Sequence, residues 1–313
     1  MKDGLVSANK KRCSVNEAKQ ALSSIVAPVA VPFLEDGDID YKSLANLVEF
    51  IIENGNRTLL LTNGDSLYSI LSDDEVAEVT KAVVKQASGR AMVVAAERRW
   101  WTGQIVAFAR YAREIGADML NVLPPDWAFS CKVDDLVEHY SAIGKEIPVL
   151  IATHLGVRTL PLDVIKALLE QQSGLVAIKD DVCSSYGRRL ATLVKGRCAL
   201  LSGGGKENYL DVMPYGVDGY LSAFMLFMPQ IAHDFWNAAC AGDIKKAVHI
   251  IETCERPFFD DLCKSADADF DALIHGAMEI AGITKRWRRK PYHSLSDEQM
   301  EKVKEFMNNI RLN

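Results

Sequence analysis

The stretch GLVAIKDD, residues 174–181, shows the pattern that decides the fold. It holds four apolar residues in a row, which is typical of a short strand buried on both faces. Similar runs recur along the chain, and amphipathic segments separate them. The eight expected strands span residues 25–33, 57–64, 91–97, 117–125, 147–154, 175–181, 198–205 and 218–224.

The segments between these runs have helical periodicity. Residues 41–55, for example, carry Leu44, Leu47, Val48 and Ile51 at the spacing that places side chains on one helix face. Strands that alternate with helices indicate the α/β class, and eight such units predict a (β/α)8 TIM barrel. A doubly wound open sheet is the alternative, but the first strand is not followed by the glycine-rich phosphate loop common in such sheets.

Further segments flank the eight units. Three helices are expected after them, near residues 242–264, 270–283 and 297–310. We therefore predict three parts, which are an N-terminal arm (1–23), the barrel (24–240) and a C-terminal helical appendix (241–313).

Composition excludes several classes of partner and site. A net charge of -6 argues against nucleic acid, which usually requires a basic face. No apolar stretch approaches the ~20 residues that span a bilayer, so no membrane partner is expected. The seven cysteines form no CxxC pair, which argues against a zinc site or a disulfide framework. Together with a polar N-terminus, this favours a reducing, cytoplasmic location.

Lys179 is the most informative candidate for catalysis, because the active site of a (β/α)8 barrel lies where the strands end. If Leu175 and Ala177 point into the barrel, alternation along the strand points Lys179 inward too. Burial there disfavours a charged amine, and a neutral amine can attack a ketone to form a Schiff base. The alternative is a surface lysine paired with Asp180 or Asp181.

Polar residues at two other strand ends also have two interpretations each. Thr62 and Asn63 belong to the sequence TNGD, which is either a simple turn or a loop whose N–H groups bind a carboxylate. Arg98 begins the sequence RRWW, which could clamp an acidic substrate or contact acids at a subunit interface.

Later strand ends add His154 and Ser222. His154 is either a hydrogen-bonded packing residue or a proton carrier. Ser222 lies near the end of the last strand and is a candidate for substrate binding.

Six segments, taken in order, resemble one known family over about residues 24–310. They are VPFLEDGDIDYKSL (31–44), LTNGDSLYSILSDDE (61–75), RYAREIGADMLNVLPP (110–125), GLVAIKDD (174–181), GVDGYLSAFMLFMPQ (216–230) and RRKPYHSLS (288–296). The chain is similar through them to the dihydrodipicolinate synthase and N-acetylneuraminate lyase superfamily of class I aldolases.

This resemblance implies a role for several residues. It implies that Lys179 attacks the ketone of pyruvate or a related 2-oxo acid, while Thr62 and Asn63 hold the carboxylate of that acid. Arg158 matches an arginine of the synthase branch. No metal or organic cofactor is implied, and the family commonly forms homo-oligomers, so a dimer or tetramer is expected.

The chain also departs from the family pattern. Asp126 stands where the family has a tyrosine that relays protons, so Asp126 or His154 would have to take that role. The sequence SGGGKEN (202–208) lacks the acidic pair that grips sugar hydroxyls in the neuraminate lyases.

The expected function is therefore that of a Schiff-base-forming lyase, aldolase or hydro-lyase. Its substrate would be pyruvate or a longer 2-oxo acid, attacked by Lys179. The alternative is a catalytically impaired homologue that binds a small 2-oxo acid for sensing or assembly.

Overall fold

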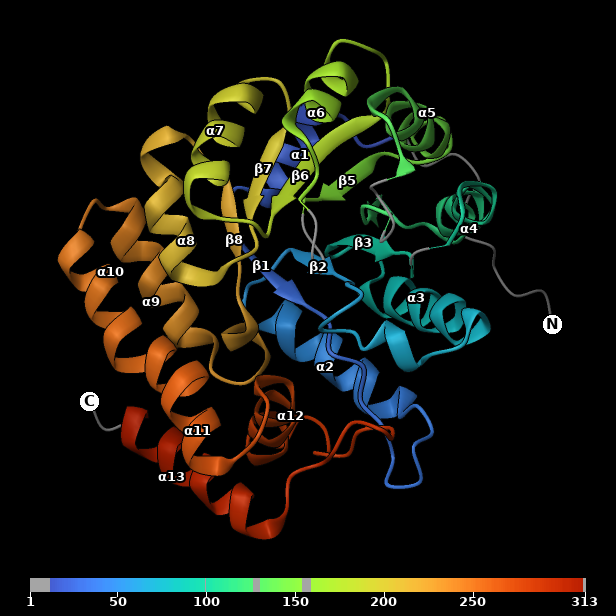
Figure 1. Ribbon diagram of the computed structural model, residues 1–313. Coiled ribbons are helices and arrows are strands. Elements are labelled where there is room, and N and C mark those ends of the chain that lie inside the picture. The colour runs from blue at the N-terminus through green and yellow to red at the C-terminus, as the bar shows by residue number, and fades with distance from the viewer. Residues whose placement is uncertain (1–11, 99, 126–129, 154–158, 312–313) are drawn as a thin grey trace.

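Eight parallel strands close into a barrel in sequence order (Figure 1). The computed structural model describes residues 12–98, 100–125, 130–153 and 159–311. The strands are β1 (Ile25–Pro28), β2 (Thr58–Leu60), β3 (Met92–Ala96), β4 (Met119–Val122), β5 (Val149–Ala152), β6 (Leu175–Asp180), β7 (Ala199–Ser202) and β8 (Gly219–Leu221). The predicted (β/α)8 barrel is confirmed, although each strand is shorter than its apolar run, which extends into the loops at one or both ends.

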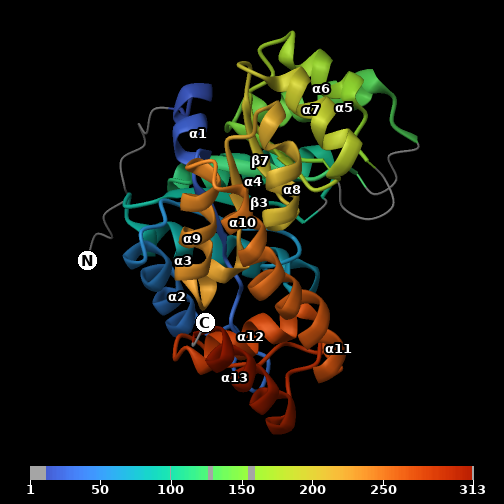
Figure 2. The ribbon, with the colours of Figure 1, turned by 90° about the vertical axis from the view of Figure 1, so that its left-hand side faces the viewer.

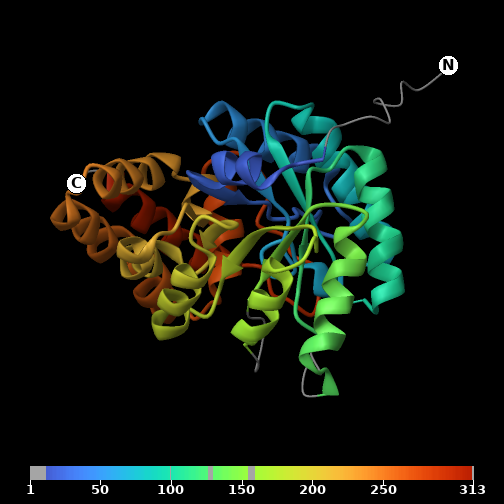
Figure 3. The same cartoon turned by 90° about the horizontal axis from the view of Figure 1, so that it is seen from above.

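Helices cover the outside of the barrel, where they bury one apolar face each (Figure 3). They are α2 (Tyr41–Glu53), α3 (Asp73–Ala87), α4 (Thr102–Ile115), α5 (Val133–Gly144), α6 (Leu162–Leu169), α7 (Ser184–Val194), α8 (Gly205–Val212) and α9 (Pro229–Cys240). Short 3-10 turns add η1 (Tyr68–Ile70), η3 (Met213–Tyr215) and η4 (Ala223–Leu226). None of the described helices is both long enough and apolar enough to cross a membrane.

A smaller apolar cluster fills the inside of the barrel. Every strand contributes to it, and so does the N-terminal helix α1 (Val15–Leu22) through Ala18 and Leu22. Because α1 leads directly into β1, it closes the end of the barrel at which the strands begin. The opposite end, where the strands finish, is left for polar side chains.

The register of β6 differs in one detail from simple alternation. Ala177 belongs to the inner cluster, as expected, but Leu175 packs in the outer one between strands and helices. The pairing of β5 with β6 shifts at Val149 and Leu150, which is the signature of a β-bulge. The expectation that Leu175 points inward is therefore wrong, whereas alternation from Ala177 still directs Lys179 inward.

The C-terminal helices pack together beside the barrel (Figures 1 and 2). Helix α10 (Ile244–Ile250) continues through two π-helical segments, η5 (Ile251–Glu255) and η6 (Pro257–Leu262), into α11 (Cys263–Ala266). The helices α12 (Phe270–Ile280) and α13 (Asp297–Arg311) follow. The three helices expected here are present, and the first is one long run with π-helical turns in its middle.

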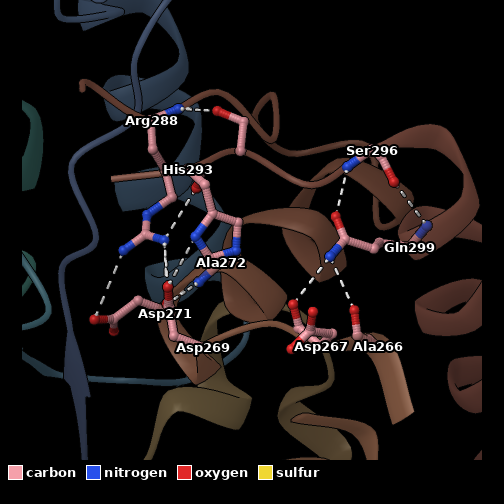
Figure 4. Close-up of polar contacts among 10 residues, drawn as sticks. Ala266, Asp267, Asp269, Asp271, Ala272, Arg288, His293, Ser296 and Gln299 are labelled. Carbon is pink, nitrogen blue, oxygen red and sulfur yellow. Dashed lines mark hydrogen bonds and ion pairs between the residues drawn. The ribbon is translucent and has the colours of Figure 1, made fainter. Parts of the chain in front are cut away.

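Two arginines of the connector between α12 and α13 fasten this region. Arg288 is 5 % exposed and donates to both carboxylate oxygens of Asp269 at 3.1 Å and to the carbonyl of His293 at 3.2 Å (Figure 4). Arg289 reaches the barrel instead, where it donates to Glu75 of α3 at 2.7 Å. This contact lowers the pKa of Glu75 to about 2. The two arginines thus tie the C-terminal helices internally and to the barrel.

Candidate functional site

A cavity of about 400 Å³ opens where the strands of the barrel end. Lys179, Asp65, Gly203 and Ser222 line it from the barrel side. The π-helical segments and α12 line it from the other side, through Glu255, Arg256, Phe259, Asp260, Phe270 and Ile274. The site is therefore shared between the barrel and the C-terminal helices.

Lys179 lies near the end of β6 and is 8 % exposed. Its ammonium group contacts the carboxylate of Asp181, two residues further along the chain. The structure thus combines both sequence interpretations. The lysine has an aspartate partner, but both side chains are largely buried and the lysine lines the cavity.

Asp181 is a site residue that the sequence reasoning named only as a possible surface partner of Lys179. Its backbone N–H donates to the Thr153 hydroxyl at 3.2 Å, which fixes the chain just after β6. Burial is the main reason why the pKa of Asp181 is raised; Asp65 and Asp180 raise it further, while Lys179 opposes the shift. The signal in the sequence was its spacing of two residues from Lys179, which places both side chains on one face of an extended chain.

Gly203 makes room for this pair. A methyl group on Gly203 would lie 1.9 Å from Oδ1 of Asp181 and 3.0 Å from Nζ of Lys179. A side chain at this position would displace the carboxylate, so glycine is needed for the close approach of β6 and β7 at the site.

Thr62 and Asp65 form a fixed loop at the end of β2. The Thr62 hydroxyl donates to the Asp65 carboxylate at 2.8 Å, and the Thr62 N–H donates to the Ser66 hydroxyl at 3.0 Å. Asn63 takes part through its carbonyl, which accepts from the Tyr68 N–H at 3.1 Å. Of these residues, Asp65 lines the cavity.

The other predicted site residues divide into three groups. Ser222 is buried and lines the cavity together with Lys179. Arg98 lies against the start of α3, where it donates to the Leu71 carbonyl and lies 3.3 Å from the Asp73 carboxylate. Asp126, His154 and Arg158 lie outside the described residues.

A buried ion pair forms the wall of the cavity towards the C-terminal helices. Lys206 is completely buried, and its Nζ lies 3.0 Å from Oε1 of Glu255 and 4.3 Å from the centre of the Phe224 ring. Burial lowers the pKa of Lys206, and Glu255 opposes that shift. The rule that sites lie at strand ends could not find Glu255, because this residue reaches the cavity from a helix far along the chain.

The described residues hold no cluster of three or more His, Cys, Asp or Glu side chains arranged for a metal ion.

Asp271 of α12 is coupled to the cavity through charge. Burial first and the Asp65 carboxylate second raise its pKa to about 7. A raised pKa means that the folded protein keeps a proton that the unfolded chain has lost, so stability falls as pH rises from about 4 to about 7.

The variant Asp271→Asn is expected to lose this pH dependence. At pH 8 its free energy of unfolding should be about 2–4 kcal/mol higher than that of the wild type, because the variant has no buried carboxylate to ionise at this position. Urea unfolding at pH 5 and pH 8 measures the effect, and the exposed Asp261→Asn is the control. Equal pH dependence in wild type and Asp271→Asn would contradict this account.

The comparisons with known proteins agree with this architecture. The model of the dihydrodipicolinate synthetase family matches residues 21–310. A 4-hydroxy-tetrahydrodipicolinate synthase of Aquifex aeolicus is 28% identical over 92% of this chain and 97% of its own. The solved dihydrodipicolinate synthase of Oceanobacillus iheyensis superposes with a TM-score of 0.82 at 24% identity over 96% of this chain and 100% of its own. An N-acetylneuraminate lyase of Fusobacterium nucleatum gives 0.80 at 19% identity over 91% and 97% of the two chains. The chain therefore belongs to the dihydrodipicolinate synthetase family and is an aldolase-type lyase.

Proposed function

We propose that this protein acts on pyruvate or a longer 2-oxo acid and forms a Schiff base with it through Lys179. The observation that carries the proposal is the position of this lysine, which is buried at the mouth of the barrel and opens into a cavity. Burying an amine costs free energy, and unlike the completely buried Lys206, Lys179 lines the cavity itself.

The chemistry follows from the properties of an iminium ion. Once the lysine nitrogen has replaced the ketone oxygen, the positive charge draws electrons from the neighbouring carbon. A carbon–carbon bond can then form or break there, or a hydroxyl group can leave. Such a reaction requires no metal or organic cofactor, and we propose that the protein uses none.

The carboxylate of the 2-oxo acid would bind at the loop of Thr62 and Asn63. The Thr62 hydroxyl donates to Asp65 in this structure, so it would have to turn from that carboxylate to the substrate. Ser222, which follows β8 and lines the cavity, would bind the substrate as well. We retain Asp126 and His154 as candidates for later proton transfers, and Arg98 and Arg158 as candidates for binding a second acidic group.

The cavity supports a substrate or acceptor larger than pyruvate. Its volume of about 400 Å³ is in the range of pockets that hold drug-sized molecules, and a three-carbon acid would leave most of it unfilled. Its lining from α8 and the C-terminal helices carries three carboxylates, from Glu207, Glu255 and Asp260, of which Glu207 pairs with Arg256 and Glu255 with Lys206. Carboxylates accept hydrogen bonds, so we propose a distal end that is rich in hydroxyl or amino groups.

Borohydride trapping tests the nucleophile. Incubation with pyruvate and sodium borohydride is expected to add one reduced pyruvate per chain, seen by intact mass and mapped to the peptide that holds Lys179. The matched variants Lys179→Met and Lys166→Met separate this lysine from a surface lysine, and only the first should abolish the adduct. An adduct that persists in Lys179→Met would overturn the assignment.

The alternative, an impaired homologue, predicts a different pattern. It would form the adduct but turn over none of a panel of 2-oxo sugar acids. Release of pyruvate from any of them, lost in Lys179→Met, supports the enzyme.

We also propose that the protein is a cytoplasmic dimer or tetramer, with the barrel over residues 24–240 and the appendix over 241–313. The seven cysteines are all free, which supports a reducing compartment.

A further inference from the structure

We propose that Asp181 is the acid–base group that carries a proton during formation of the Schiff base at Lys179. This inference rests on the proposed function, because it takes Lys179 as the nucleophile. It adds a catalytic residue that neither the strand-end rule nor the resemblance assigned.

The geometry presents one carboxylate to the reacting nitrogen. The side chains of Lys179 and Asp181 are 10 % and 18 % exposed, and they are in direct contact. The absence of a side chain at Gly203 leaves the space that this contact needs. The carboxylate is thus held within reach of a proton on the lysine nitrogen, as general acid–base catalysis requires.

The neighbouring carboxylates of Asp180 and Asp65 already accept other hydrogen bonds. Asp180 accepts hydrogen bonds from the backbone N–H groups of Val182 at 3.1 Å and Cys183 at 3.2 Å, so it shapes the turn after β6. Asp65 accepts the Thr62 hydroxyl. Burial raises the pKa of Asp181, and this makes it easier for the carboxylate to accept a proton.

The proton balance closes within the site. Asp181 first takes one proton from the Lys179 ammonium, which leaves a neutral amine. The amine attacks the ketone carbon, and one of its two remaining protons moves to the ketone oxygen, which gives a neutral carbinolamine. Asp181 then returns its proton to that hydroxyl group, which leaves as water while the C–N bond becomes the iminium. The aspartate ends as a carboxylate next to the new positive charge.

The test is the rate at which pyruvate is trapped on Lys179, measured by rapid quench into borohydride. Asp181→Asn keeps the size and the hydrogen-bond acceptor but cannot take up a proton. Since acid–base groups contribute about 10²–10⁴-fold, trapping should slow by at least about 100-fold. The exposed Asp211→Asn is the matched control and should trap at the wild-type rate.

A second variant guards against a purely structural effect. Asp181→Ala should also trap slowly, and added formate should accelerate it by acting as the missing carboxylate, whereas formate should not affect the wild type. Trapping at the wild-type rate in Asp181→Asn, or an Asp181→Ala that formate does not accelerate, would overturn the proposal. Failure of the wild type itself to form an adduct would instead overturn the proposed function, so the two failures are distinct.

Discussion

Replacement of Lys206 by alanine is expected to lower the free energy of unfolding by about 3–5 kcal/mol. Lys206 is completely buried and neutralises Glu255, with which it makes one bond from Nζ at 3.0 Å and one from its backbone N–H at 3.1 Å. Without the lysine, a largely buried carboxylate has lost its charged partner, and the aromatic surface of Phe224 loses its cover.

Urea unfolding followed by circular dichroism measures this effect as a shift of the midpoint at constant slope. The matched control is Lys81→Ala, because the Lys81–Glu78 pair is exposed and should contribute less than about 1 kcal/mol. The double variant Lys206→Met with Glu255→Gln removes both charges at similar volume, so most of the stability should return. A Lys206→Ala that is no less stable than Lys81→Ala would contradict the account.

Replacement of His275 by leucine is expected to remove a large source of acid sensitivity. His275 lies inside α12 with 1% of its surface exposed, and neither ring nitrogen has a hydrogen-bond partner among the described residues. Burial lowers its pKa to about 3. Below pH 6.5 the unfolded chain therefore binds a proton that the folded chain does not bind. Stability consequently falls by about 1.4 kcal/mol for each unit by which the pH is lowered.

The expected difference accumulates to about 3 kcal/mol between pH 6.5 and pH 4.5. Burial lowers the pKa of His139 to about 4, so His139 also reduces stability as pH falls. Asp271, whose pKa is raised, increases stability as pH falls. On acidification from pH 6.5 to pH 4.5, the free energy of unfolding of the wild type should therefore fall by more, or rise by less, than that of His275→Leu. The exposed His249→Gln is the control, and identical pH profiles for His275→Leu and the wild type would refute the prediction.

The barrel could be predicted from sequence because its signals are local. Short apolar runs mark the strands, and the helices between them carry their own periodicity and caps, such as Ser72 before α3. The error at Leu175 arose from a bulge in the pairing of β5 with β6, where Val176 is the extra residue, and such a bulge is a property of the pairing that the apolar run does not reveal. The predicted strands end too late for the same reason. A strand ends where its hydrogen-bonded pairing with its neighbours ends, and the composition of the run does not show that point.

The site could be predicted only in part. Lys179 and Ser222 line the cavity because both lie where barrel strands end. Glu255, Arg256 and Asp260 reach it from π-helical turns whose position depends on packing between distant segments. Arg98 was predicted either to clamp an acidic substrate or to contact acids at an interface. Its guanidinium group lies against the first turn of α3, a contact that no local pattern encodes.

A structure of crystals soaked in pyruvate shows whether Lys179 binds the substrate covalently. We expect continuous density from Nζ of Lys179 to the second carbon of pyruvate, with the Asp181 carboxylate beside the new bond and the pyruvate carboxylate at the loop of Thr62 and Asn63. Pyruvate bound elsewhere, or bound in the cavity without a bond to Lys179, would contradict it.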